Sequence, residues 1–141
     1  MRNYVALLLV AALLAAGCAR TTGKQFRQIV YSYTGGVAGF NQSMVIRSDG
    51  SFELADQGKS GKKGRLSSAE VAHLRQLVNA VAWSDIQEKY IDPRVADAIM
   101  EGLTVEIGKN KYATVVGTGA QPPSELGQLM GKLKQILDKQ K

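Results

Sequence analysis

The chain has 141 residues, of which 45% are hydrophobic and 21% are charged, and it carries a formal net charge of +6. This length suffices for one compact core and excludes a machine of several domains. The most apolar stretch is a single short run near the start of the chain, which also excludes an integral membrane protein with several spans.

The first residues are typical of a targeting segment. Arg2 precedes an apolar run over residues 4–16. This arrangement fits the charged start and apolar centre of a secretory signal, and the run is shorter than the ~20 residues of a membrane-spanning helix. Small residues, Ala-Ala-Gly, close the run immediately before Cys18. We therefore predict a signal peptide over residues 1–17.

Cys18 is the only cysteine in the chain. Small residues before a cysteine resemble the processing site of bacterial lipoproteins, and the resemblance implies cleavage after Gly17 and a lipid anchor on Cys18. Several acyl chains together hold a protein on a membrane durably. Ala19, where an Asp would redirect sorting, implies the outer membrane facing the periplasm in a Gram-negative host. The alternative is an ordinary cysteine beside a plain cleavable signal.

Residues 18–24 are predicted to form the lipidated cysteine and a polar tether, and residues 25–141 the globular domain. Alternating β-branched and aromatic residues predict strands over residues 25–34, 42–47 and 52–55. A glycine-rich loop separates the first two strands, and a turn over residues 48–51 joins the next two. Residues 56–65 contain no apolar side chain and are predicted to form a mobile, exposed loop.

Two helices follow from capping and periodicity. Ser67 and Glu70 have the spacing of a capping box. The apolar stripe of this helix comprises Val71, Leu74, Leu77, Val78 and Val81. A second short helical segment is expected over residues 84–90, limited by Pro93. The last helix opens at residues 122–124. Its stripe comprises Leu126, Leu129, Met130, Leu133 and Ile136.

Between these helices, residues 99–107 alternate strictly, residues 108–111 form a turn, and residues 112–116 form the second arm of a hairpin. The resulting order is βββ-α-ββ-α. It predicts an α+β fold with an antiparallel sheet of about five strands and two helices packed on one face.

The side chains that serve catalysis or metal binding form no recognisable set. His73, the only histidine, lies outside the helical stripe, so we expect a solvated residue. A catalytic histidine needs a nucleophile and an orienting acid, and metal sites need ligands at short regular spacing. No cofactor motif is present. We predict a protein without catalytic residues, metal or cofactor.

The glycine loop admits two interpretations. Gly35, Gly36 and Gly39 are followed by polar residues and another strand rather than by a helix, and no Lys-Ser or Lys-Thr closes the motif, which argues against a phosphate-binding loop. The glycines fit a turn that needs positive φ angles, and they equally fit a loop that displays residues to a partner.

The basic stretch Lys59, Lys62, Lys63 and Arg65 also admits two interpretations. It fits a simply solvated loop, and it fits a surface attracted to anionic lipid headgroups. No aromatic residues are interleaved with these charges as a stacking platform for nucleic acid requires. We predict no nucleic-acid partner.

Three segments of the chain form a combined pattern. They are Tyr-Thr-Gly-Gly-Val-Ala-Gly-Phe at residues 33–40, Asp-Pro-Arg-Val-Ala-Asp at residues 92–97, and Ala-Gln-Pro-Pro at residues 120–123. Over roughly residues 27–137 this pattern resembles the emfourin family, which are small protein inhibitors of thermolysin-like zinc metalloproteases. The chain differs from the family pattern at Thr34, often Ser, at Val37, commonly aromatic, and in its lipid anchor.

The resemblance implies a non-enzymatic inhibitor that docks an exposed loop over a protease cleft, with the zinc belonging to the target. The contact residues that it implies are Gly35, Gly36, Val37, Gly39 and Phe40, with Arg94 and Asp97 in a second loop. Asp97 also fits a residue that ties its loop to the sheet. The alternative function is a non-enzymatic envelope lipoprotein that serves as a binding or scaffold module for another partner. The pattern does not indicate an oligomeric state.

Overall fold

The computed structural model describes residues 23–140, so the predicted signal peptide and Cys18 lie outside the described residues. A seven-stranded sheet has the strand order β4-β3-β2-β1-β6-β7-β5. The elements are β1 (Phe26–Gly35), β2 (Phe40–Arg47), β3 (Ser51–Asp56), β4 (Lys59–Arg65), α2 (Ser68–Ala80), the 3-10 turn η1 (Trp83–Asp85), β5 (Lys89–Tyr90), β6 (Ile99–Ile107), β7 (Asn110–Gly117) and α3 (Ser124–Lys139). The predicted α+β class is confirmed, but the sheet has seven strands and is mixed, because β5 runs parallel to β7.

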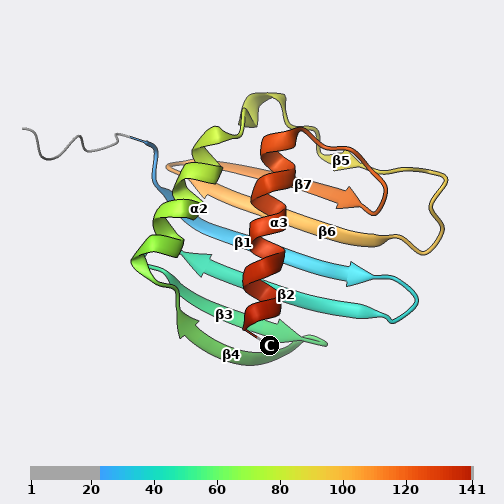
Figure 1. The fold of residues 1–141 in the computed structure, drawn as a ribbon, viewed down its shortest axis with the longest axis horizontal. Helices are drawn as coiled ribbons and strands as arrows, with labels where there is room; N and C mark the ends of the chain where they lie inside the picture. Colours follow the sequence, from blue (N-terminus) through green and yellow to red (C-terminus); the bar gives the residue numbers. More distant parts are fainter. Residues whose placement is uncertain (1–22, 141) are drawn as a thin grey trace, which may run out of the picture.

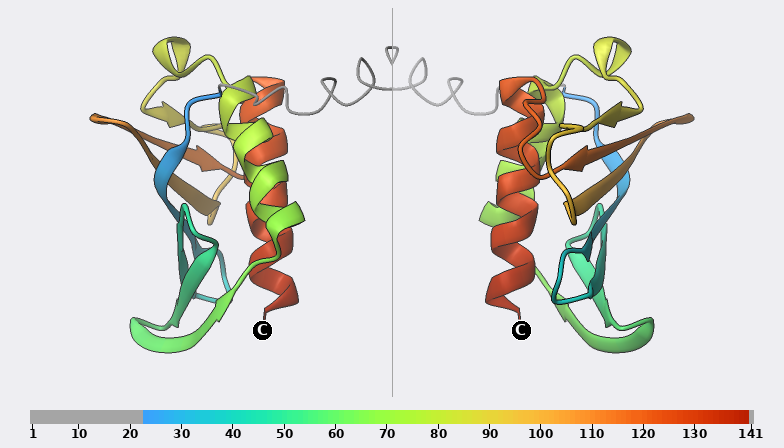
Figure 2. Two further views of the ribbon diagram at one scale, coloured as in Figure 1. Left: turned by 90° about the vertical axis from the view of Figure 1, so that its left-hand side faces the viewer. Right: turned by 90° about the vertical axis from the view of Figure 1, so that its right-hand side faces the viewer.

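The two helices form one layer over one face of the sheet, and no helix of the described segment covers the opposite face (Figures 1 and 2). Between the layers lies a hydrophobic core, to which β1, β2, β3 and β6 contribute buried residues, whereas β5 and β7 contribute partly buried ones. Neither helix in this segment has the length and apolar character needed to cross a membrane. Every buried core residue of the described segment lies between Phe26 and Leu137, so the chain from Thr21 onward contains this core and is expected to fold on its own.

Helix α2 begins as the sequence predicts. The Glu70 backbone N–H donates to Ser67 Oγ at 3.2 Å, and the Ser67 backbone N–H donates to Glu70 Oε2 at 2.9 Å, which completes the capping box. The bond from the Ser67 N–H also lowers the pKa of Glu70. Val71, Leu74 and Val78 are buried as expected. In α3 all five predicted stripe residues are buried, together with Leu137.

Strand β1 contains an irregularity that simple alternation does not predict. Alternation places Phe26 on the opposite face from Ile29 and Tyr31. The pairing between β1 and β6 shifts register between Phe26 and Gln28, and this bulge turns Phe26 into the core. Phe26, Ile29 and Tyr31 are all fully buried as a result.

The prediction of a mobile loop over residues 56–65 is wrong. Residues 59–65 form β4, which pairs antiparallel with β3 at the edge of the sheet. Every side chain of β4 is exposed, so the strand has no apolar pattern to detect. Gly64 has a structural reason: a Cβ there would lie 2.5 Å from the Phe52 ring, so only glycine lets this core aromatic lie beneath the strand. The lysines of β4 disfavour pairing of this exposed edge with a strand of another molecule.

The prediction of a helical segment over residues 84–90 is wrong beyond its first residues. Only η1 is helical, and its start is fixed by the Trp83 indole N–H, which donates to Val78 O at 2.9 Å. The chain then extends along the edge of β7. There the Val115 N–H donates to Glu88 O at 3.0 Å, and Thr114 Oγ1 donates to Gln87 O at 2.8 Å. Hydrogen bonding to an open sheet edge thus replaces helix formation.

We expect Ser67→Ala to lower the free energy of unfolding by ~1 kcal/mol, because it removes the acceptor of the Glu70 N–H at the start of α2. Urea denaturation of the chain from Thr21 onward measures this. The matched control is Ser68→Ala, at an exposed first position of the same helix, which should change stability by less than ~0.5 kcal/mol. Equal effects of the two substitutions would contradict the role of the capping box.

Candidate functional site

Four connecting segments meet at the end of the sheet opposite to the point where the chain enters the domain (Figure 1). We call this end the loop end. Its segments are residues 36–39 between β1 and β2, residues 57–58 between β3 and β4, residues 91–98 before β6, and residues 118–123 after β7. The contact residues that the sequence resemblance implies lie in the first and third of these segments, except Gly35 and Phe40, which flank the first segment at the ends of β1 and β2.

The glycine loop between β1 and β2 needs glycine for two separate reasons. Gly35, Gly36 and Gly39 have φ angles of 90°, 70° and 64°, which side chains rarely tolerate. A Cβ on Gly35 would also lie 2.9 Å from Ala98 O, and one on Gly36 would lie 2.9 Å from Ile99 Cγ1. The Gly39 N–H closes the turn by donating to Gly36 O at 3.0 Å. The loop is therefore both a positive-φ turn and a close packing contact.

This contact brings together the two loops that the resemblance pairs. Gly35 is the register partner of Ile99, so residues 35–36 lie directly beside residues 98–99. Asp97, one residue further back, has a φ of 53°, and its side chain is exposed. A left-handed Asp with a short polar side chain is a typical way to end a loop before a strand. The φ angle of Asp97 bears on how the loop ends; whether its side chain ties the loop to the sheet or contacts a partner stays a prediction.

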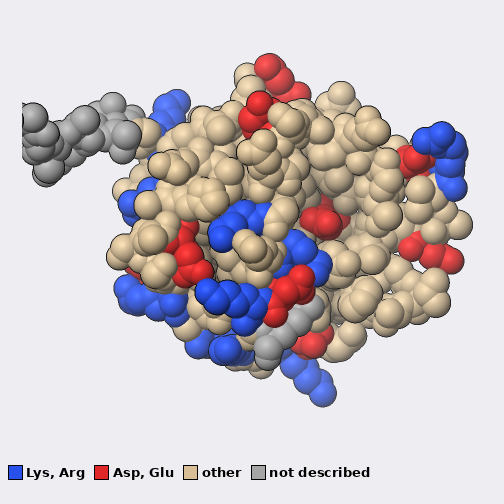
Figure 3. All heavy atoms as spheres, viewed as in Figure 1, with Lys and Arg blue, Asp and Glu red and all other residues tan. Residues whose placement is uncertain are grey.

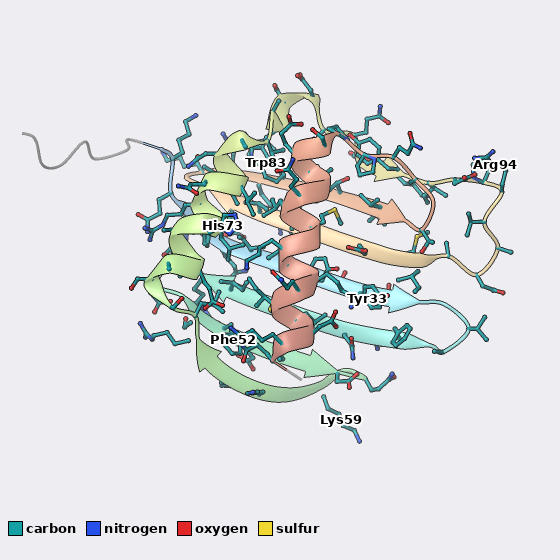
Figure 4. The ribbon with its side chains drawn as sticks, in the orientation of Figure 1. Tyr33, Phe52, Lys59, His73, Trp83 and Arg94 are labelled. Carbon is teal, nitrogen blue, oxygen red and sulfur yellow. The ribbon has the colours of Figure 1, made fainter. Side chains whose placement is uncertain are left out.

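The second loop is fixed by an ion pair at its start. Asp92 Oδ1 accepts from the backbone N–H and the Nε of Arg94 at 3.0 and 2.9 Å, and Asp92 Oδ2 accepts from a terminal nitrogen of the same guanidinium at 2.8 Å. These bonds hold the pKa of Asp92 below its usual value. The side chain of Arg94 is 87% exposed, so the guanidinium reaches into solvent while one edge is held (Figure 4).

Two further segments brace the site, and sequence reasoning missed both. Gln57 donates from its backbone N–H to Asn41 O at 2.8 Å and from Nε2 to Gly39 O at 3.2 Å. Gln57 lies where a mobile loop was expected, so no sequence signal pointed to it. On the other side the Thr118 N–H donates to Ile99 O at 2.9 Å. The sequence indicates this contact only indirectly, through the predicted hairpin of residues 99–107 with residues 112–116.

Apolar side chains are presented at the loop end. Val37, at the tip of the glycine loop, is 93% exposed, and Phe40 is 36% exposed. The Phe40 ring packs against Tyr33, with the ring centroids 5.3 Å apart. Lys134 Nζ of α3 lies 4.4 Å from the centroid of Tyr33. Tyr33 lies where β1 extends beyond α3, so this part of the sheet is not covered by a helix (Figure 4).

A partly buried polar pair lies beside this apolar surface, because Glu101 is the register partner of Tyr33. The Tyr31 hydroxyl donates to Glu101 Oε2 at 2.7 Å. Burial raises the pKa of Tyr31, with the nearby Glu101 carboxylate as a further cause, so the hydroxyl stays protonated and remains a donor. Glu101 also lines a groove of about 300 Å³ beside α3, together with Val116, Pro122 and Lys134. This hydrogen bond joins β1 to β6, and it occupies one carboxylate oxygen of Glu101.

The only histidine of the chain lies away from the loop end. His73 is exposed on α2, as expected, and lies on the far side of α3 from the loop end (Figure 4). Within residues 23–140, no three His, Cys, Asp or Glu side chains are grouped so as to hold a metal ion. The distinctive feature of the loop end is its shape: a braced backbone with an exposed apolar tip.

No protein-family model matches the chain, and searches of curated proteins and of solved structures found no match. The resemblance to the emfourins stays a prediction that rests on the three segments described above.

The packing of the glycine loop predicts a graded response to Ala substitution. Gly35→Ala should cost ~2 kcal/mol or more, because the new Cβ combines a strained φ with a clash against the Ala98 carbonyl. Gly39→Ala, where a Cβ has open space, should cost only ~1 kcal/mol for its φ. Urea denaturation of both variants measures the two losses in the free energy of unfolding. A smaller cost at Gly35 than at Gly39 would show that the two loops do not pack as described.

The ion pair of the second loop predicts a titration change. Arg94→Gln removes the guanidinium that is the main cause of the lowered pKa of Asp92, so the pKa of this carboxyl should rise toward its ordinary value. NMR titration of the Asp92 side-chain carbon measures it, with the carboxyl of Asp49 as the internal reference because Ser51 and Arg65 hold its lowered pKa. An unchanged Asp92 titration would contradict the pairing.

Proposed function

We propose that this protein is an envelope lipoprotein, anchored through Cys18, whose loop end binds and inhibits a thermolysin-like metalloprotease. The observation that carries the proposal is the glycine loop: its tip presents Val37 almost fully to solvent while its backbone is held by Gln57 on one side and by residues 98–99 on the other. A loop that is already ordered loses little conformational freedom on association, so more of its contact energy appears as affinity.

The chemistry of the tip defines how inhibition would work. Residues 36–39 carry no side chain that ligates zinc. The proposed mechanism is therefore occlusion of the cleft by the loop, with Val37 entering an apolar pocket of the protease, and it does not involve capture of the metal by a side chain of the tip. Phe40 and Tyr33 extend the apolar surface at the base of the loop, and the exposed part of Arg94 offers a charged contact beside it.

A substitution at the tip tests this function directly. The chain from Thr21 to Lys141 is expected to inhibit a thermolysin-like protease in a peptide-cleavage assay, and Val37→Asp should weaken inhibition by roughly 30-fold or more, the size of an interface hot spot. The matched control is Ala72→Asp, which adds the same charge at an exposed position of α2 away from the loop end and should leave inhibition unchanged.

Absence of inhibition across several thermolysin-like proteases at micromolar concentration would overturn the proposal. A stable complex with a non-protease envelope protein, lost in Val37→Asp and kept in Ala72→Asp, would establish the scaffold alternative at the same loop. Because both variants alter exposed residues, retention of the unfolding midpoint distinguishes lost binding from lost folding.

A further inference from the structure

The end of the sheet opposite to the loop end is strongly basic. We call it the tether end, because the chain enters the domain there. Strand register brings exposed cations from five strands or their flanking turns to this end, with Arg47 opposite Gln28, Lys111 opposite Glu106 and Arg65 opposite Ser51. The six exposed cations of the tether end are Lys24, Arg27, Arg47, Arg65, Lys109 and Lys111.

Few carboxylates compensate these charges. The nearby acids are fewer than the cations: Asp49, 3.6 Å from Arg65, and Glu106 lie in the adjoining strand ends and turns, Glu70 lies in the first turn of α2, and Asp85 lies in η1. At the loop end, by contrast, residues 56–59 and 91–98 carry three carboxylates and two cations. In the space-filling view Lys and Arg gather along the left-hand edge, with some acidic side chains among them, and along the lower edge, where β4 lies; the surface beside α3 toward the loop end has fewer charged side chains (Figure 3). The long direction of the sheet therefore separates a cationic end from a near-neutral one.

A hollow opens at the same end. It has a volume of about 620 Å³, and its walls include Lys24, Lys109, Asn110, Trp83 and Tyr112. The Trp83 and Tyr112 rings stack with their centroids 5.3 Å apart. The Trp83 N–H is already bonded to Val78 O, so Trp83 offers a partly exposed ring, and Trp and Tyr rings are favoured at the boundary between lipid headgroups and water. Two ammonium groups beside such a pair suit a phosphate group at that boundary.

The predicted tether places the tether end close to the membrane. Five residues separate Cys18 from Lys24, and a fully extended segment of that length spans at most ~20 Å. An anchor on Cys18 therefore holds the tether end, and not the loop end, next to the lipid. Attraction of basic residues to an anionic leaflet adds about fivefold in affinity for each residue near the surface.

We propose that the tether end is a docking surface for anionic phospholipid headgroups, in which a headgroup phosphate enters the hollow between Lys24 and Lys109. Docking of this end fixes the orientation of the domain, so that β1 stands away from the membrane and the loop end faces soluble partners. This inference rests on the anchored lipoprotein of the proposed function and adds the lipid class and the orientation.

Trp83 makes the inference measurable, because it is the only tryptophan in the chain. The mature lipidated protein is reconstituted in phosphatidylcholine vesicles, and in vesicles of one part phosphatidylglycerol to two parts phosphatidylcholine. Both contain a lipid with a spin label on its headgroup. Trp83 fluorescence should be quenched at least twofold more in the anionic vesicles, and high salt should remove the difference because it screens the attraction. Equal quenching in the two compositions would overturn the docking.

Paired substitutions identify the surface. For the segment from Thr21 to Lys141, flotation with the anionic vesicles should show that Lys24→Gln with Lys109→Gln weakens binding roughly tenfold or more. The matched control, Lys59→Gln with Lys89→Gln, removes the same charge at exposed positions away from the tether end and should change binding less than twofold. Equal weakening by both pairs would show a nonspecific charge effect and overturn the site.

Two controls separate this inference from others. Inorganic phosphate that displaces the segment from vesicles at low millimolar concentration would indicate a small-anion site and overturn lipid docking. The flotation assay uses neither the anchor nor a protease. Vesicle binding without protease inhibition would therefore support the docking surface and overturn the proposed function. Protease inhibition without vesicle binding would support the proposed function and overturn the docking surface.

Discussion

The structure depends on the position of β1 at the centre of the sheet. This strand pairs with β2 along one edge and with β6 along the other, so its register sets the alignment of both halves. Ile29 and Tyr31 lie fully buried under the helices. A slip of one residue would turn both to the open face, so the core fixes the register. The same register places Gly35 beside Ile99, and the loop end is thus a consequence of core packing.

Sequence reasoning identified the elements that bury a face and missed those that do not. Strict alternation in residues 99–107 marked β6, and the spacing of Ser67 and Glu70 marked the start of α2, because burial and capping leave local patterns. Strand β4 leaves no such pattern, since its side chains are all exposed and its stability comes from backbone pairing with β3. Strand β5 exists because the edge of β7 was open to it.

The individual loops of the candidate site could be predicted from the sequence, but the contact between them could not. The glycines of residues 35–39 and the Asp-Pro-Arg of residues 92–94 are visible as loop signals in the sequence. Their contact depends on a pairing between strands separated by more than sixty residues, which no local pattern encodes. The brace from Gln57 depends in turn on β4, because that strand forms the turn that brings Gln57 to Asn41 and Gly39. The missed strand β4 therefore hid a part of the site.

The length of the glycine loop favours display over simple connection. Antiparallel neighbours need only two residues to turn, and a two-residue turn would leave nothing projecting beyond the sheet. Here four residues, 36–39, stand between β1 and β2, and the most exposed large apolar side chain of the described segment is at their tip. The ten residues of β1 span ~30 Å, which separates this tip from the cationic end of the sheet. A strand with a basic surface at one end and an apolar, braced loop at the other fits the proposed role, in which the loop is held at a fixed distance from a membrane.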